Sequence, residues 1–225
     1  MTILDHLVGD NDKKGRLELS SGYERDGFAR LGKVLDSSTT LLVLEYLDVC
    51  RIEQGLRADA GIIAAQLADN IASSVAWSQP LVSIASQLLD APVDVFGIAY
   101  LCKPARTGLP ALWHQDGAPW AERLGGSPSL TIWIALDHTN WSNGCLIVIP
   151  GSHCRAPQPL RTNALRASMF GAEMDASLVD ESSAIELPLE SGHGSVHHPN
   201  LIHGSGPNRT MHPRRGLAIR YRGLK

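Results

Sequence analysis

Residues 130–149 read LTIWIALDHTNWSNGCLIVI. Two apolar runs rich in β-branched residues, 130–136 and 145–149, lie on either side of a polar stretch. Short runs of this composition, bounded by Gly, Pro, Asn or Asp, are typical of β-strands. The segment therefore predicts two strands of a β-rich domain.

Three further segments of the C-terminal half share this composition. They are 93–101 (VDVFGIAYL), 184–189 (AIELPL) and 217–221 (LAIRY). Several short strands separated by Gly- and Pro-containing turns predict a β-sandwich or a jelly-roll barrel. Because the chain has 225 residues, we expect a single domain over residues 1–225, with the jelly-roll core at 91–225.

The N-terminal third has helical spacing instead, so we expect residues 1–90 to form a mainly helical layer that supports the barrel. Two of its helices are predicted at 57–75 and 78–89, which are rich in Ala, Ile, Leu, Gln and Ser. An earlier helix is predicted to be capped by Ser20 or Ser21 and to contain Tyr23, Phe28 and Leu31. The fold class is thus mainly β with supporting α.

Two stretches, 117–128 and 155–180, fit neither pattern and are expected to be long connections. The second is an insertion too long for a plain loop in a compact domain. We expect it to contain a short helix. Two interpretations remain open for it: a lid over a site, or a solvated surface insertion.

The composition argues against nucleic-acid binding and against a membrane-spanning segment. The chain is 44% hydrophobic and 19% charged with a formal net charge of −3, whereas nucleic-acid binding without sequence preference needs a basic surface. No apolar run reaches the roughly 18 residues of a membrane span, and the first residues do not have the pattern of a secretory signal. The four cysteines have no CxxC spacing. We therefore expect reduced thiols in a cytoplasmic protein that binds neither nucleic acid nor membrane.

The segment WHQDG (113–117) holds the most informative polar pair. In a strand, His114 and Asp116 would project from the same face, because residues two apart do so. An imidazole and a carboxylate side by side make two thirds of a facial metal site. A lone pair of this kind is more often a hydrogen-bonded surface pair, so a third ligand is needed.

Histidines are concentrated near the C-terminus, where a third ligand can be sought. They are His193, His197, His198, His203 and His212. His203 follows two apolar residues and precedes a turn, which places it at the end of a buried strand. His197 and His198 are the alternative ligands, and spacing alone does not decide between His198 and His203.

Two histidines and one carboxylate leave coordination positions open, which suits Fe(II) oxygen chemistry better than structural zinc. A dicarboxylate co-substrate also needs an arginine, whose planar fork binds a carboxylate bidentately. Arg214 and Arg215 stand at the head of the predicted strand 217–221. Most of the other arginines between 209 and 222 are expected to form a solvated face.

Taken in order, these segments resemble the phytanoyl-CoA dioxygenase-like family of Fe(II)/2-oxoglutarate oxygenases. The resemblance rests on WHQDG (113–117), TIWIALDHTNWSNGCLIVIPGSH (131–153), HHPNLIHGSGPNRTMHPRRGLAIRY (197–221) and, more weakly, YERDGFARL (23–31). It implies a double-stranded β-helix, which is a jelly-roll barrel of the cupin type, with helices supporting one sheet.

The resemblance also implies a set of site residues. The iron ligands would be His114, Asp116 and His203. The family's 2-oxoglutarate arginine lies eleven residues after the distal histidine, which gives Arg214, with Arg215 as the fallback. Ser205 would help to hold the same carboxylate, whereas Trp133 and Lys103 fall where the family often contacts 2-oxoglutarate. Trp133 is equally compatible with a core residue, and Lys103 is equally compatible with a surface charge at the end of a strand.

The implied function is a non-haem Fe(II)/2-oxoglutarate-dependent dioxygenase with O2 as co-substrate. It would hydroxylate or otherwise oxidise an unactivated C–H bond of a small molecule, as in specialised metabolism, and release succinate and CO2. The presence of Asp116 disfavours halogenation. An apolar substrate pocket is expected from Leu112, Trp113, Trp120, Met169 and Phe170. Two alternatives are a catalytically silent jelly-roll that serves as a binding partner, and a metal-dependent cupin enzyme that does not use 2-oxoglutarate.

Overall fold

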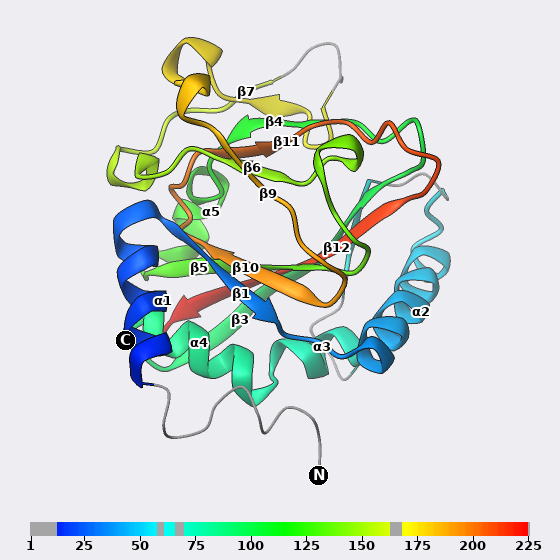
Figure 1. Ribbon diagram of the computed structural model, residues 1–225, viewed down its shortest axis with the longest axis horizontal. Coiled ribbons are helices and arrows are strands. Elements are labelled where there is room, and N and C mark those ends of the chain that lie inside the picture. Colours follow the sequence, from blue (N-terminus) through cyan, green and yellow to red (C-terminus); the bar gives the residue numbers. More distant parts are fainter. Residues whose placement is uncertain (1–12, 58–60, 66–69, 163–167, 225) are drawn as a thin grey trace.

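The computed structural model describes residues 13–57, 61–65, 70–162 and 168–224, and shows two antiparallel sheets facing each other (Figure 1). The larger sheet contains, in spatial order, β1 (Phe28–Lys33), β10 (His193–His197), β5 (Ser129–Ala135), β12 (Arg214–Gly223), β3 (Val93–Lys103) and β2 (Ile62–Ala64). The smaller sheet contains β4 (Ala111–His114), β11 (His203–Ser205), β6 (Leu146–Val148) and β9 (Ile185–Leu187). The predicted mainly β jelly-roll is confirmed.

Helices cover the outer face of the larger sheet (Figure 1). They are α1 (Lys13–Asp26), α2 (Ser37–Glu53), α3 (Ile71–Ala76) and α4 (Gln79–Leu89). A fifth helix, α5 (Gly117–Leu124), follows β4. Helix α2 begins after Asp36, whose carboxylate accepts the backbone N–H of Thr39 at 2.7 Å, an N-cap that satisfies one free donor of the first turn.

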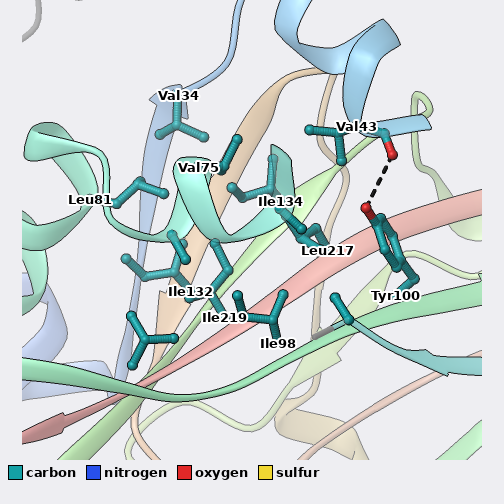
Figure 2. Close-up of a cluster of buried hydrophobic side chains, with 14 of the residues drawn as sticks. Val34, Val43, Val75, Leu81, Ile98, Tyr100, Ile132, Ile134, Leu217 and Ile219 are labelled. Carbon is teal, nitrogen blue, oxygen red and sulfur yellow. Dashed lines mark hydrogen bonds between the residues drawn. The ribbon is translucent and has the colours of Figure 1, made fainter. Parts of the chain in front are cut away.

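The main hydrophobic core fills the space between these helices and the larger sheet (Figure 2). Alternate residues of three adjacent strands supply the sheet side: Ile98 and Tyr100 of β3, Ile132 and Ile134 of β5, and Leu217 and Ile219 of β12. Val43 of α2, Val75 of α3 and Leu81 of α4 pack against them. The Tyr100 hydroxyl donates to the Val43 carbonyl at 3.1 Å, so this buried polar group is satisfied.

The remaining residues of these strands point into the barrel. Thr131 and Trp133 of β5 and Arg214, Ala218 and Arg220 of β12 line an internal cavity. Successive side chains of a strand project to opposite faces. The same strands therefore supply both the core under the helices and the wall of the cavity.

The prediction of one helix through Tyr23, Phe28 and Leu31 was wrong, because the chain changes from helix to strand within it. Tyr23 belongs to α1, whereas Phe28 and Leu31 belong to β1. Gly27, at φ +81°, ends the helix, and its N–H donates to the Tyr23 carbonyl, as is common at helix C-termini. Ser20 and Ser21 lie inside α1 and do not cap it.

The helix predicted over 57–75 was also wrong in part. Within it, β2 pairs with β3, so that Ile62 and Ala64 lie opposite Leu101 and Ala99. The free edge of β3 provides a hydrogen-bonding partner that outweighs local helical preference. Residues 58–60 and 66–69 lie outside the described part, and the last residues of the segment belong to α3.

The predictions at 78–89 and for all five strands were correct. The helix is α4, and the strands correspond to β3, β5, β6, β9 and β12. The connection at 117–128 contains α5, which was not predicted. In the described part of 155–180, β7 (Arg161–Thr162) pairs with β8 (Ala172–Glu173), and one 3-10 turn, η4 (Ala176–Leu178), is the short helix. Two expectations remain predictions: that residues 155–180 form a lid, and that residues 1–225 form a single domain.

Four thiols are free: Cys50, Cys102 and Cys145 are buried, and Cys154 is exposed. Within the described ranges, no helix combines the length and the apolar character that crossing a membrane requires.

We expect Ile132→Ala to destabilise the fold by about 2–5 kcal/mol, because it leaves a cavity in the main core. Ile132 is completely buried, whereas Leu41 of α2 is 57% exposed. Urea unfolding measures the effect, with Leu41→Ala as the control that should change stability by less than about 0.5 kcal/mol. Equal effects of the two substitutions would contradict this placement of the core.

Candidate metal centre

His114, Asp116 and His203 come together in the barrel. His114 ends β4 and His203 begins β11, and the two are direct partners in the antiparallel register. Asp116 is outside the strand, with helical dihedrals (φ −67°, ψ −27°) just before α5. The expectation that His114 and Asp116 project from one strand was therefore wrong. The helical conformation of Asp116 nevertheless places its carboxylate near the two histidines, and one ligand atom from each of the three residues lies within 4.8 Å of the others.

Both histidines present the same nitrogen to the cluster. Nδ1 of His114 lies 2.7 Å from the Leu112 carbonyl, and Nδ1 of His203 lies 2.9 Å from the Leu201 carbonyl. Each Nδ1–H donates to its carbonyl, so the Nε2 lone pair is free, 3.9 Å from Asp116 Oδ1 in both cases. Burial lowers the pKa of both imidazoles below the ordinary value, which keeps them neutral and able to bind a metal.

Asp116 is held as a carboxylate. Burial alone would raise its pKa, but the contact with His197 and the electrostatic influence of His203 and Arg220 place the pKa well below its ordinary value. His197 Nε2 lies 3.4 Å from Oδ2, and the Thr131 hydroxyl donates to the same oxygen at 3.0 Å. These contacts fix Oδ2, which leaves Oδ1 facing the two imidazoles.

His197 and His198, the alternatives considered for the third ligand, lie outside the cluster. His197 ends β10 opposite Thr131 and supports Asp116. His198 Nδ1 accepts the backbone N–H of Asn200 at 3.0 Å. Among the described residues, the donor cluster thus contains two neutral imidazoles and one carboxylate. This set fits Fe(II) with open positions, and it is one ligand short of a closed zinc site.

Arg214, Ser205 and Trp133 line the same cavity as the three donors. The Arg214 guanidinium is buried and donates to the carbonyls of Gly144 at 2.9 Å and Leu101 at 3.2 Å, while its Nε has no hydrogen-bond partner in the described part. Burial lowers its pKa to about 10, so it stays charged at neutral pH. The guanidinium lies 5.5 Å from the centre of the Trp133 ring.

The structure separates Lys103 and Arg215 from this pocket. The Lys103 amine donates to the carbonyls of Leu109 at 2.6 Å and Gly206 at 2.8 Å, and it does not line the cavity. Burial, assisted by nearby Arg214, lowers its pKa to about 6. Arg215 is bound bidentately by Asp137 at 2.7 and 2.8 Å. Both residues thus have structural partners, and of the adjacent arginines 214 and 215 it is Arg214 that lines the cavity.

A cleft of about 560 Å³ adjoins the donor cluster. Trp120 of α5 and Phe170 of the insertion line it, and the Phe170 ring lies 4.8 Å from the ring of His114. Met169 lines the neighbouring cavity. Three of the five residues expected in an apolar pocket are therefore near the donors.

Leu112 and Trp113, the other two, line neither space. The Trp113 indole N–H donates to Glu181 at 2.8 Å, and Trp113 packs against the hydrophobic cluster of Ile149, Met174 and Ile202. The direction of β4 side chains near its irregular pairing with β11 was not readable from the sequence.

Arg220 was missed by sequence reasoning, which expected a solvated face. It lies on the cavity face of β12, opposite Thr131 of β5, and lines both the cavity and the cleft. The signal was present in the sequence, because Gly216, Ala218 and Arg220 alternate with the apolar residues Leu217, Ile219 and Tyr221 at the period of a strand.

Comparison with known proteins identifies the family and the fold. The family model of phytanoyl-CoA dioxygenase matches residues 54–216. L-proline trans-4-hydroxylase from Streptomyces griseoviridis is 28% identical over 91% of this chain and 85% of its own length. Rat peroxisomal phytanoyl-CoA dioxygenase is 36% identical over 40% of this chain, which spans 27% of that enzyme.

A solved structure shows the same fold with a bound co-substrate. EvdO2 from Micromonospora carbonacea var. aurantiaca, complexed with 2-oxoglutarate, has a TM-score of 0.77 and 28% identity, over 96% of this chain and 93% of its own. The predicted family, fold class and cofactor class are confirmed by these likenesses. The family match covers well over half of the sequence, and the chain belongs to the phytanoyl-CoA dioxygenase family.

Proposed function

We propose that the protein is a non-haem Fe(II)/2-oxoglutarate-dependent oxygenase that hydroxylates an unactivated C–H bond of a small molecule. O2 is the second co-substrate, and succinate and CO2 are the co-products. The observation that carries the proposal is the buried cluster of His114, Asp116 and His203, which shares one cavity with Arg214. The 2-oxoglutarate complex of a 28% identical structure supports it.

In this proposal His114, Asp116 and His203 hold the iron through the atoms that face one another. Bound iron, with 2-oxoglutarate and O2, supplies the oxidising power that no side chain has. Thr131 and His197 keep Asp116 oriented, as supporting contacts do for metal ligands generally.

Arg214 and Ser205 hold the far carboxylate of 2-oxoglutarate, and Trp133 forms the wall beside it. The unpartnered Nε–H of Arg214 is a buried donor that favours an anionic partner. Lys103 and Arg215 steady the surrounding backbone and side chains through the contacts described above, away from the co-substrate.

Phe170 and Trp120 position the substrate and exclude water. Their rings form an apolar border beside His114, so that a C–H bond can be held near the metal in a dry site. The reaction takes place on a small molecule, without nucleic acid or membrane. With free thiols throughout, the cytoplasm is the proposed location.

We expect His203→Ala to weaken Fe(II) binding by well over tenfold, because changes around a metal ligand already cost about 10–100-fold. Anaerobic calorimetric titration of the apo-protein with Fe(II) measures this. His198→Ala is the matched control, since it removes an imidazole outside the cluster and should bind iron like the wild type. Equal losses in the two variants would contradict the ligand assignment.

We expect Arg214→Gln to weaken 2-oxoglutarate binding roughly 10- to 100-fold, the worth of a charge-assisted hydrogen bond. Anaerobic titration of the Fe(II) protein, read by the visible metal-to-ligand charge-transfer band, gives the affinity. Arg215→Gln removes the same charge one residue away and should stay near the wild-type value, with circular dichroism confirming the fold. A wild-type protein that binds iron without this band would instead favour a silent jelly-roll or a cupin enzyme independent of 2-oxoglutarate.

A further inference from the structure

We propose that Arg220 binds a carboxylate of the substrate, so that the substrate is an apolar small molecule carrying a carboxylate group. The inference rests on the proposed function and concerns the cleft beside the metal centre. Arg220 lines both the cavity and this cleft.

Arg220 occupies the cavity face of β12 at the end near Asp116. Its register partners are Gly97 of β3 and Thr131 of β5. Gly97 presents no side chain there, so the aliphatic part of Arg220 lies across the sheet, and the two residues line the cleft together. Since Thr131 donates to Asp116, the guanidinium lies beside the metal centre.

Arg220 differs from the neighbouring arginines because, among the described residues, it makes no hydrogen bond or ion pair with a carboxylate or carbonyl, although its charge acts on nearby Asp116. Arg214 donates to two carbonyls, Arg215 pairs with Asp137, and Arg222 pairs with Asp94 at 2.6 Å. Nε of Arg220 is buried and has no hydrogen-bond partner among the described residues. A buried donor without a partner is costly, and the cost is removed when a ligand accepts from it.

Trp120 holds the guanidinium in place through its ring. The Arg220 guanidinium carbon lies 5.5 Å from the centre of the Trp120 ring, and that of Arg123 lies 5.7 Å from the same ring. Stacking of this kind stabilises a planar cation and leaves its edge free for hydrogen bonds. Arg220 is thus an oriented donor at the border of the cleft.

The charge of the cleft selects an anion. Arg123 and Arg220 both line it, and Asp116, already committed to the donor cluster, is the one carboxylate among the described residues of its lining. Ile62, Phe96, Leu160 and Phe170 supply apolar surface. A volume of about 560 Å³ is ordinary for a small-molecule site. A planar guanidinium matches a carboxylate bidentately, and the apolar lining matches the remainder of the molecule.

The experiment uses calorimetry on Zn(II)-substituted protein saturated with 2-oxoglutarate, so that the metal and co-substrate sites are filled and no turnover occurs. The probes are 4-phenylbutyrate and its neutral isostere 4-phenylbutyramide. The wild type should bind the acid at least about tenfold more tightly than the amide, the effect of one charge-assisted hydrogen bond. Arg220→Gln should bind both equally, at the amide's affinity, with zinc content verified.

Arg123→Gln is the matched control, because it removes the same charge from an exposed residue of the same cleft. It should keep most of the preference for the acid. Equal losses in the two variants would show that only the general field matters and would overturn the proposal. A wild type without preference for the acid, including one that binds neither probe, would also overturn it.

A second titration separates this proposal from the proposed function. Arg220→Gln should bind 2-oxoglutarate within about twofold of the wild type in the charge-transfer assay, because Arg214 holds the co-substrate. A loss as large as that of Arg214→Gln would make Arg220 a co-substrate residue and overturn the anchor. A protein that lacks the band but prefers the acid through Arg220 would retain the anchor and lose only the proposed oxygenase activity.

Discussion

The alternation of side chains along β12 determines which of its residues enter the hydrophobic core and which line the cavity. Leu217, Ile219 and Tyr221 are fully buried toward the helices, whereas Arg214 and Arg220 point into the barrel. A shift of one residue in the pairing with β3 or β5 would exchange the two faces. It would place both guanidiniums under the helices, where burial without partners is prohibitive. The hydrophobic core therefore fixes the register, and the register fixes where the charges of the site lie.

The two arginines also divide the cavity into two ends. Arg220 is six positions after Arg214, which is about 20 Å along a strand. Arg214 lies near Gly144, and Arg220 lies opposite Thr131, which contacts Asp116. Two cations lining a cavity with one carboxylate are stabilised when anions bind. In the assignment proposed above, a dianionic co-substrate at one end and a carboxylate of the substrate at the other would satisfy that charge.

Sequence reasoning was most successful where local pattern and tertiary environment agree. The five strands and helix α4 were predicted because their alternation or helical spacing is also the pattern of burial. It failed at β1 and β2, whose residues became edge strands only because β10 and β3 offered free backbone partners. Such long-range pairing is not encoded within a short window of sequence.

The candidate site likewise contains residues that the sequence predicted and residues that it did not. His114 and Asp116 were predicted together from their spacing, although the chain joins them by a helical step and not along a strand. The selection of His203 over His198 needed the family resemblance, because both lie in one polar segment. Arg220 was predictable in principle from the period-two alternation starting at Gly216, yet its contact with Trp120 joins β12 to α5, a long-range contact that spacing does not reveal.

The two ends of the cavity, at Arg214 and at Arg220, are formed by different parts of the fold. At the Arg214 end, a side chain on Gly216 would collide with the Trp133 ring, and one on Gly144, at φ +82°, would collide with the Gly206 carbonyl. Close backbone approaches of this kind tolerate little substitution.

At the Arg220 end, Trp120 and Phe170 come from α5 and the 155–180 insertion, outside the strands of the barrel. Segments that connect strands accept change more readily than the strands do. Two relatives of this chain are named for different substrates, L-proline and phytanoyl-CoA. With Arg214 as the proposed anchor of 2-oxoglutarate, α5 and the insertion are the segments in which substrate specificity can change without altering the strands that carry His114, His203 and Arg214.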